Sequence, residues 1–274
     1  MAVINPAVND AELIEEELDG TSKKRSRSAD TEIKNTTPSD TTGMEDMQLT
    51  KQQHNTTFFI GRVWFPGLPD EMSILCWNCR GLGHPKAVPS LKDLIRVYKP
   101  DIFFLIETLS HSNKIREVCY LLGYDSYFTV DRDGRSGGLA VIWKSSIQCN
   151  IINYSSNFIN LQVYDSDRGN WRLTSFWGYS NHARRRQSWN LLRDLAAMST
   201  DPWCIGDFND LLTSDDKLGE SERPTWLYNG FRSAVNDCNL HDLPLEGYPF
   251  TWFKSLGTPH AIEERLDKAF HTSS

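Results

Sequence analysis

The chain has 274 residues, of which 39% are hydrophobic, and its net charge at pH 7 is −7. A chain of this length and composition can bury one sizeable hydrophobic core and still carry a tail. No apolar run approaches the roughly 18 residues of a membrane span, and the acidic N-terminus lacks the pattern of a secretory signal peptide. We therefore expect a nuclear or cytoplasmic protein that is neither secreted nor membrane-bound, and the six scattered cysteines fit free thiols in a reducing compartment.

The negative charge is concentrated near the N-terminus. Residues 1–71 hold seven Lys and Arg against thirteen Asp and Glu, so they carry −6 of the total charge. The composition of residues 1–57 predicts a disordered acidic tail, and its basic cluster at 23–27 is either a nuclear-localisation patch or a solvated linker. Residues 58–71 are apolar and turn-rich, and they are either a docked extra strand or a junction. The nearly neutral remainder has no large field for nucleic acid, so any such binding must come from a local patch.

From residue 72 onward, a folded domain is predicted over 72–274. Residues 72–77 predict a strand that runs into a glycine turn. Residues 88–98 have apolar side chains at helical spacing, with Ser90 as the expected cap. Residues 101–108 predict a buried strand that ends at Glu107. A second helix is expected over 113–124, and a glycine turn within 133–138 leads into a further strand.

The second half of this domain begins with strand patterns in direct succession. Residues 152–165 and 170–179 predict two strands around a turn at 167–170. Helices are predicted over 186–198 and 229–243, with a short apolar run at 203–206 between them. A strand over 248–253 and a final short element over 261–270 follow. This mixed order favours an α/β fold in which layered sheets carry helices on the outside.

Five polar side chains each lie at the far end of an apolar run, and these are Asn78, Glu107, Asp207, Asn209 and Asp267. Residues two apart on an extended chain share a face, so Asp207 and Asn209 are expected to project together. An Asx turn that caps a strand is the alternative for this pair. If the strand ends converge, a set of carboxylates and amides suits a hard cation such as Mg²⁺. An Asp beside an Asn can activate and hold a water, which indicates metal-assisted hydrolysis of a phosphate ester.

The stretches "WNCRG", "LIET", "GDFND" and "ERLDKAF", in this order, resemble the endonuclease/exonuclease/phosphatase superfamily. The longer stretches "WNCRGLGHPKAVPSLKDLIRVYKPDIFFLIET", "GRSGGLAVIWK" and "RLTSFWGYSNHARRRQSW" are most similar to the endonuclease domain of plant LINE-type (non-LTR) retrotransposons. The resemblance covers roughly residues 72–270. It implies a four-layer α/β sandwich that cleaves DNA phosphodiesters with Mg²⁺, or with Mn²⁺ in its place.

The resemblance also implies roles for the five polar residues. Glu107 is then the metal ligand, Asp207 orients or deprotonates the attacking water, and Asn209 holds the scissile phosphate and that water. Asn78 hydrogen-bonds within the site, and Asp267 orients a catalytic histidine.

Further residues are implied in substrate binding. Thr251 and Trp252 are expected near the DNA-binding rim. The basic stretch Arg184, Arg185 and Arg186 is either a phosphate-contact patch or a solvated helix N-terminus. DNA is the expected partner, with no membrane and no obligate protein partner.

Two departures from the family pattern bear on activity. Trp177 stands where the family has a tyrosine whose hydroxyl donates to the phosphate, and Tyr179 would need a register shift to replace it. The family's terminal Ser-Asp-His motif is absent, and His271 follows Asp267 too closely to replace its histidine. We also expect the last strands of the sandwich to be missing, which would leave an unpaired apolar sheet edge.

Three functional hypotheses follow from these observations. The first is an incomplete Mg²⁺-dependent DNA endonuclease domain with weak or no activity. The second is a small-molecule or lipid phosphatase or phosphodiesterase of the same superfamily. The third is a non-catalytic remnant or binding module.

Overall fold

The computed structural model describes residues 58–62, 72–134, 136–166, 169–198, 202–243 and 248–272. The expectations for residues 1–57, including the basic cluster, lie outside the described residues. All the described residues belong to one compact unit that spans Gln52–Ser274. No helix in these ranges is long and apolar enough to cross a membrane.

A five-stranded sheet forms the first part of the fold, in the order β1-β2-β3-β5-β4. Its strands are β1 (Phe58–Arg62), β2 (Ser73–Asn78), β3 (Ile102–Ile106), β4 (Ser126–Asp133) and β5 (Ser136–Trp143). Strands β2 and β3 are parallel and are connected through helix α1 (Ala87–Tyr98), and α2 (Ser112–Leu121) connects β3 to β4. Because β2 and β3 are parallel, their last residues, Asn78 and Ile106, lie side by side at the same end of the two strands.

A six-stranded sheet forms the second part, in the order β11-β14-β9-β8-β7-β6. Its strands are β6 (Cys149–Ser155), β7 (Phe158–Val163), β8 (Trp171–Trp177), β9 (Pro202–Asp207), β11 (Leu240–Asp242) and β14 (Asp267–Thr272). Helices α3 (Arg185–Ala197) and α4 (Thr225–Asp237) belong to this part. A small third sheet consists of β10 (Lys217–Leu218), β13 (Ile262–Glu264) and β12 (Trp252–Lys254).

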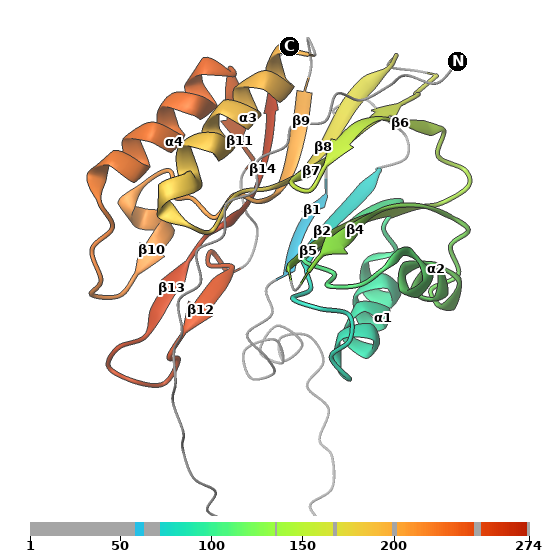
Figure 1. Ribbon diagram of the computed structural model, residues 1–274, viewed down its shortest axis with the longest axis horizontal. Coiled ribbons are helices and arrows are strands. Elements are labelled where there is room, and N and C mark those ends of the chain that lie inside the picture. The colour runs from blue at the N-terminus through green and yellow to red at the C-terminus, as the bar shows by residue number, and fades with distance from the viewer. Residues whose placement is uncertain are drawn as a thin grey trace, which may run out of the picture. The chain divides into compact units, whose positions relative to one another are not determined.

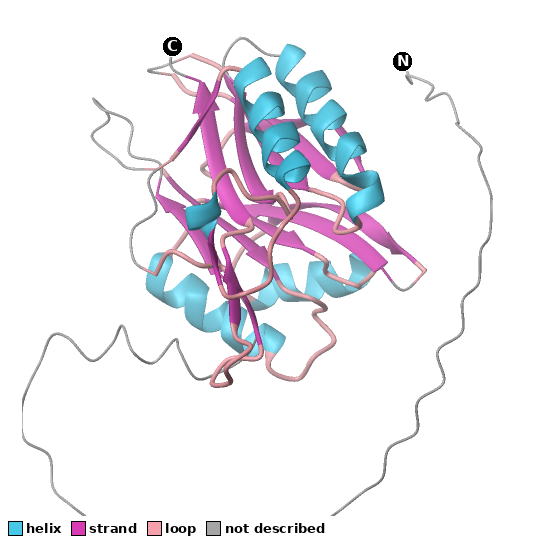
Figure 2. Cartoon of the chain, turned by 90° about the vertical axis from the view of Figure 1, so that its left-hand side faces the viewer, coloured by secondary structure: helices cyan, strands magenta, loops and turns pink. Residues whose placement is uncertain are grey.

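Three buried apolar clusters define four layers. One cluster fills the space between the two large sheets, with Phe104 from the first sheet and Leu161 from the second. A second cluster packs α1 and α2 against the first sheet, and a third packs α3 and α4 against the second sheet. The helix pairs therefore lie on opposite outer sides of the two sheets (Figure 1, Figure 2). This arrangement confirms the predicted α/β sandwich.

The burial pattern explains why these residues form these elements. Every residue of β3 is buried, as expected for a central strand that is covered on both faces. Helix α1 buries Ala87, Leu91 and Ile95, which lie on one face at helical spacing. Its end is marked by Lys99, which has a left-handed backbone conformation just before Pro100.

Several local expectations are wrong. Helix α1 begins at Ala87, so Ser90 lies inside its first turn and is not its cap. Strand β4 was not anticipated, and the predicted strand over 152–165 is two strands that turn at Ser156 and Asn157. Helix α4 begins at Thr225, four residues before the predicted start, and 261–270 holds parts of two strands.

The two uncertain ends of the domain have definite places in the sheets. Strand β1 pairs antiparallel with β2, which is the docked-strand alternative for residues 58–62. Strand β14 lies between β9 and β11 and pairs with both. Among the described residues, β14 is therefore not an edge strand, and the short strand β11 forms this edge of the sheet.

Candidate active site

The predicted site residues converge where the ends of the two large sheets meet. Asn78 ends β2, and Glu107 follows the last residue of the neighbouring parallel strand β3. In the other sheet, Asp207 ends β9 and lies directly opposite Asp267, the first residue of antiparallel β14. The two sheets therefore bring side chains that are up to 189 positions apart in the sequence to one place.

Asn78 connects the two sheets through its side-chain amide. Its Nδ2 donates to Glu107 Oε1 at 2.8 Å and to Asp207 Oδ2 at 2.9 Å. Because a carboxamide nitrogen has two hydrogens, it can serve both carboxylates at once. Its Oδ1 accepts a hydrogen bond from the backbone N–H of Arg80 at 3.2 Å, which fixes the orientation of the amide.

A backbone turn places Glu107. Its φ of 54° lies in the left-handed region, which few non-glycine residues adopt. The following backbone N–H groups, of Thr108 and Leu109, donate to the carbonyls of Gly138 and Gly137. A Cβ at Gly138 would collide with the Thr108 hydroxyl. The predicted glycine turn thus allows β5 to approach the turn that carries Glu107.

Close strand packing places Asp207 and Asn209. A Cβ at Gly206 would collide with the carbonyl oxygen of Phe176, and one at Gly178 would collide with that of Phe208. Asn209 has a φ of 55°, and its N–H donates to Asp207 Oδ1 at 2.9 Å. The carboxamide Nδ2 of Asn209 also donates to the Gly178 carbonyl at 2.9 Å. The Asx-turn alternative is therefore present in the same residues that form the site.

The two buried aspartates are electrostatically unfavourable together. The pKa of Asp207 is raised to about 6, mainly by burial. The hydrogen bond from Asn78 lowers this pKa, whereas the negative charge of Glu107 raises it. Burial also raises the pKa of Asp267 well above its ordinary value, and the Asp207 charge raises it further. The Thr251 hydroxyl accepts from the N–H groups of Leu266 and Asp267, both at 3.0 Å, and so fixes the start of β14.

The oxygen ligands of the site suit a hard metal ion, although they do not form a dense cluster. In the described part of the chain, no group of three or more His, Cys, Asp or Glu side chains is arranged to hold an ion. Mg²⁺, however, typically takes one or two carboxylates and keeps several waters. Glu107 and its neighbours offer carboxylate and amide oxygens without a thiolate or imidazole, and this chemistry fits Mg²⁺ and Mn²⁺. Cys76 and Cys79 lie within two different buried clusters, so the two thiols do not form a joint metal site.

Trp177 and Tyr179 lie in different surroundings. Trp177 is paired with Asp207 in the β8–β9 register, and it packs against the cluster between the sheets. Its buried indole Nε1 has no hydrogen-bond partner. Tyr179 lies beyond the end of β8, although the predicted strand runs to residue 179. Its ring lies under the guanidinium of Arg184 at 3.7 Å.

The basic stretch does not form one exposed patch of three arginines. Arg184 and Arg186 are exposed, but Arg185 is buried and forms an ion pair with Asp210 at 3.2 Å. Arg185 also donates to the Ser180 carbonyl at 3.0 Å. The expected patch is therefore corrected to Arg184 and Arg186, because helix α3 turns Arg185 toward the protein interior.

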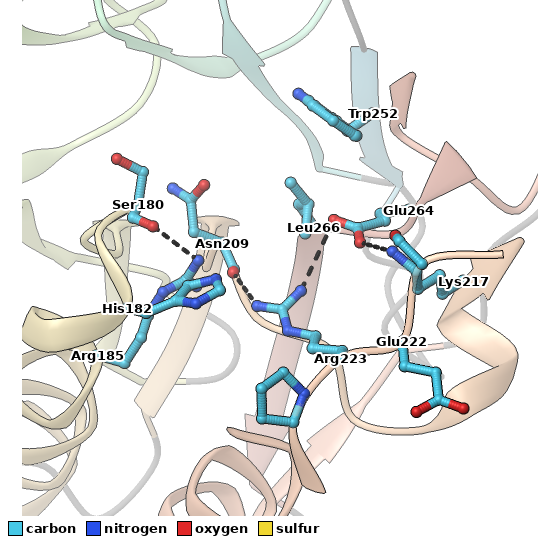
Figure 3. A pocket seen from close by; sticks show the side chains of 12 residues that line it. Ser180, His182, Arg185, Asn209, Lys217, Glu222, Arg223, Trp252, Glu264 and Leu266 are labelled. Carbon is cyan, nitrogen blue, oxygen red and sulfur yellow. Dashed lines mark hydrogen bonds and ion pairs between the residues drawn. The ribbon is translucent and has the colours of Figure 1, made fainter. Parts of the chain in front are cut away.

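A pocket of about 350 Å³ lies beside Asn209. Trp252 lines it, whereas Thr251 is buried and accepts a hydrogen bond from the backbone N–H of Leu266. Figure 3 shows the other side chains around the pocket, from segments that are distant in the sequence. They are Ser180, His182, Arg185, Lys217, Ser221, Glu222, Arg223, Pro224, Glu264 and Leu266.

Sequence reasoning missed most of this pocket. His182 is exposed and lines the pocket. Burial lowers the pKa of His182, and the charges of Arg185 and Arg223 lower it further. Arg223 and Glu264 were not singled out. The one sequence signal for the basic residue Arg223 was Asp210, the second acid of "GDFND", because an acid in an apolar stretch needs partners. In the structure Asp210 is fully buried.

His271 does not lie near the aspartates of the site. It is on β14 opposite Trp203, at the far end of the strand from Asp267, and its ring stacks on the Trp203 ring. This agrees with the expectation that His271 is no substitute for a catalytic histidine. Strand geometry explains it, since four residues along a strand span about 13 Å.

The fold is shared with enzymes that act on several kinds of phosphate ester. The endonuclease domain of TRAS1, a telomere-specific non-LTR retrotransposon, superposes with a TM-score of 0.52 at 12% identity, covering 73% of this chain and 84% of that one. A 3′–5′ exonuclease from Neisseria meningitidis gives 0.54 at 18% identity, covering 73% and 86%. A mannosyl-6-phosphatase from Bacteroides thetaiotaomicron gives 0.51 at 17% identity, covering 74% and 86%. At these identities the similarity establishes the fold alone.

The family of the chain is established by its sequence and not by the structural similarity alone. No curated protein sequence matches the chain significantly. The model of the endonuclease/exonuclease/phosphatase family matches residues 75–274, which include the five converging polar residues. On this match and the shared sandwich fold, the chain belongs to the endonuclease/exonuclease/phosphatase family.

Proposed function

We propose that this protein hydrolyses phosphodiester bonds of DNA with the help of a divalent metal ion, as a retrotransposon-type endonuclease domain. The observation that carries the proposal is the bridge from Asn78 to both Glu107 and Asp207, which joins the ends of the two sheets into one polar site. The TRAS1 domain and the Neisseria enzyme, one of whose structures is described as bound to a product DNA hairpin, favour DNA over other phosphate esters.

Each residue of the site would have a defined task. Glu107 would hold the Mg²⁺ ion, whose chemical contribution when bound is to stabilise negative charge on the phosphate oxygens. Asp207 would orient a water and accept its proton as the water oxygen bonds to phosphorus. The P–O bond to the leaving strand then breaks, and the leaving oxygen takes up a proton from solvent water, which yields one phosphate end and one hydroxyl end.

Amide groups would hold the reacting atoms in place. Asn209 keeps one of its two side-chain N–H donors for Gly178, so the second can donate to a phosphate oxygen. Asn78 keeps Glu107 and Asp207 in fixed orientation. We further propose that activity is weak, because the tyrosine hydroxyl of the family is replaced by Trp177, and because His271 lies at the other end of β14 from Asp267.

The test is nicking of supercoiled plasmid by the purified full chain in the presence and absence of Mg²⁺. We expect slow, Mg²⁺-dependent nicking that the change Asp207→Ala reduces by a factor of about 10²–10⁴. Asp194→Ala removes an exposed carboxylate from helix α3 and serves as the matched control.

The alternative functions give different results in the same assay. DNA binding by a folded protein without nicking would favour a non-catalytic binding module. Phosphate release from a sugar phosphate without nicking would favour a small-molecule phosphatase, as the fold shared with the mannosyl-6-phosphatase allows. Nicking that persists in Asp207→Ala would contradict the assigned site.

A further inference from the structure

A buried cluster of charged side chains surrounds Asp210, the residue that follows Asn209. Asp210 is fully buried, and three side chains surround its carboxylate. Trp189 Nε1 donates to Oδ2 at 2.8 Å, Arg223 Nη2 donates to Oδ1 at 3.1 Å, and Arg185 Nη1 lies 3.2 Å from Oδ1. Burial raises the pKa of Asp210, and Arg185, Trp189 and Arg223 oppose this by favouring the carboxylate.

Arg223 reaches from this cluster to the main chain of the site. The same Nη2 atom that contacts Asp210 donates to the carbonyl oxygen of Asn209 at 2.8 Å. The side chain of Arg223 is only 7% exposed, so water competes little for this bond. Arg223 lies just before helix α4, fourteen residues beyond Asn209, and it belongs to neither of the strands that carry the catalytic groups.

The hydrogen bond matters because Asn209 has a strained backbone. A non-glycine residue at φ 55° costs free energy, and it persists only where its surroundings hold it. The Asn209 N–H is held by Asp207 and the carboxamide by Gly178. The carbonyl is held by Arg223, so all three polar parts of the residue have partners.

The second arm of the guanidinium extends to the pocket. Arg223 Nη1 lies 3.7 Å from Glu264 Oε2, and Glu264 on β13 also pairs with Lys217 of β10. Figure 3 shows this series of contacts from Asn209 through Arg223 and Glu264 to Lys217 along the pocket. A planar fork with fixed donors can link two such partners at once, whereas the single ammonium of a lysine cannot reproduce that geometry.

We propose that Arg223 is a positioning residue that holds Asn209 in its working conformation and links it to the pocket wall. The proposal rests on the proposed function, because it assigns Arg223 a role through Asn209 and not through contact with the phosphate. Asp210 in turn holds Arg223, and helix α3 holds Asp210 through Arg185 and Trp189.

The test compares Arg223→Gln with Arg232→Gln in the full chain. Arg232 is a matched control, since it also donates to a backbone carbonyl in the loop that follows β9. Its acceptor is Leu212 and not Asn209. In plasmid nicking, we expect Arg223→Gln to lower kcat about 10-fold to 100-fold, the scale of misplacing a catalytic group, with little change in KM. We expect Arg232→Gln to keep kcat within about twofold. Equal losses of kcat in the two variants at equal thermal stability would overturn the proposal.

A second readout is independent of catalysis. In protein labelled with ¹⁵N-asparagine, the backbone and side-chain signals of Asn209 are identified by their loss in Asn209→Ala. We expect both signals to move in Arg223→Gln and to stay in place in Arg232→Gln. If the wild-type chain does not nick DNA, the proposed function fails, and these signals alone decide the role of Arg223. Unmoved signals in Arg223→Gln would overturn it whatever the activity.

Loss of a buried charge can also unfold the protein, so a second variant is included. Arg223→Lys keeps the charge but not the fork, and it leaves Asp210 with a cation nearby. We expect a folded protein in which the Asn209 signals still move and kcat still falls. Full kcat with unmoved signals in Arg223→Lys would show that charge alone suffices and would overturn the positioning role.

Discussion

The two halves of the domain, residues 72–147 and 148–272, hold their share of the site by different physical means. Among the described residues, the six buried charged side chains all lie in the second half, and they are Arg185, Asp207, Asp210, Asp216, Asp267 and Lys268. The buried polar residues of the first half are Asn78 and Thr108. The first half thus presents Glu107 from an apolar layer through its backbone turn. In the second half, buried ion pairs of Asp210 and of Lys268 stand next in sequence to Asn209 and Asp267.

Besides the cluster around Asp210, a second group of buried charges includes Lys268, the residue that follows Asp267. Lys268 is fully buried, and its Nζ donates to Asp216 Oδ2 at 2.9 Å. The same Asp216 oxygen accepts from the Leu212 N–H at 2.7 Å, which holds the loop after Asn209. Arg265 pairs with Asp242 through two bonds of 2.7 and 2.9 Å. Burying charges is costly, so such a network is better evidence for fixed geometry than for added stability.

The largest expected effect comes from removing one buried partner. Lys268→Met should lower the free energy of unfolding by about 3–5 kcal/mol, because it leaves Asp216 buried with less compensation. Lys144→Met in the first half removes an ion pair with Asp101 whose lysine side chain is 41% exposed, and it should cost about 1 kcal/mol or less. Urea denaturation of both variants measures the difference. Equal losses would contradict the contrast between the halves.

A smaller effect is expected from the backbone turn of the first half. Gly138→Ala should lower the free energy of unfolding by about 1–3 kcal/mol, because φ is 86° and the new Cβ meets Thr108. It should also slow nicking by displacing Glu107. Gly134→Ala is the control, since Gly134 has a φ of 56° in the same hairpin but open space around it. Gly134→Ala should cost about 1 kcal/mol or less and leave nicking unchanged.

The smallest effect concerns the reactivity of the thiols. Burial raises the pKa of Cys79 to about 12 and that of Cys119 to about 11, so little thiolate exists at pH 8. Cys76, Cys79, Cys119 and Cys204 are buried, whereas Cys149 and Cys238 are half-buried. In the folded protein we expect only the last two to react with a thiol reagent, slowly, and all six to react in urea. Mass spectrometry of the labelled protein identifies the cysteines that have reacted. Rapid labelling of Cys79 would show that the layer of α1 and α2 separates readily from the first sheet.

Some errors of sequence reasoning have a common physical origin. Helix α1 was placed from its apolar spacing, but its first turn has no side-chain cap, so Ser90 was a misleading signal. Strand β4 was missed because all but two of its residues are only half-buried, which weakens the alternation that marks a strand. The sequence predicts a single strand over 152–165 because the turn at Asn157 contains no glycine or proline.

The α/β fold class and the five polar residues at strand ends could be predicted from the sequence alone. Their positions at the ends of apolar runs follow from local pattern, because strand ends are set by where apolar residues stop. The glycines of "GRSGG" and "GDFND" also carried local information, since their roles depend on backbone space that a side chain would fill.

The charges that surround the site, in contrast, could not be predicted without the folded arrangement of the chain. Arg185 belongs to an apparently basic surface stretch, yet α3 turns it inward onto Asp210. Arg223 and Glu264 reach Asn209 and the pocket from segments that no spacing connects to "GDFND". Such contacts form between segments far apart in the chain, and their energy depends on burial and on partners, which local sequence does not encode.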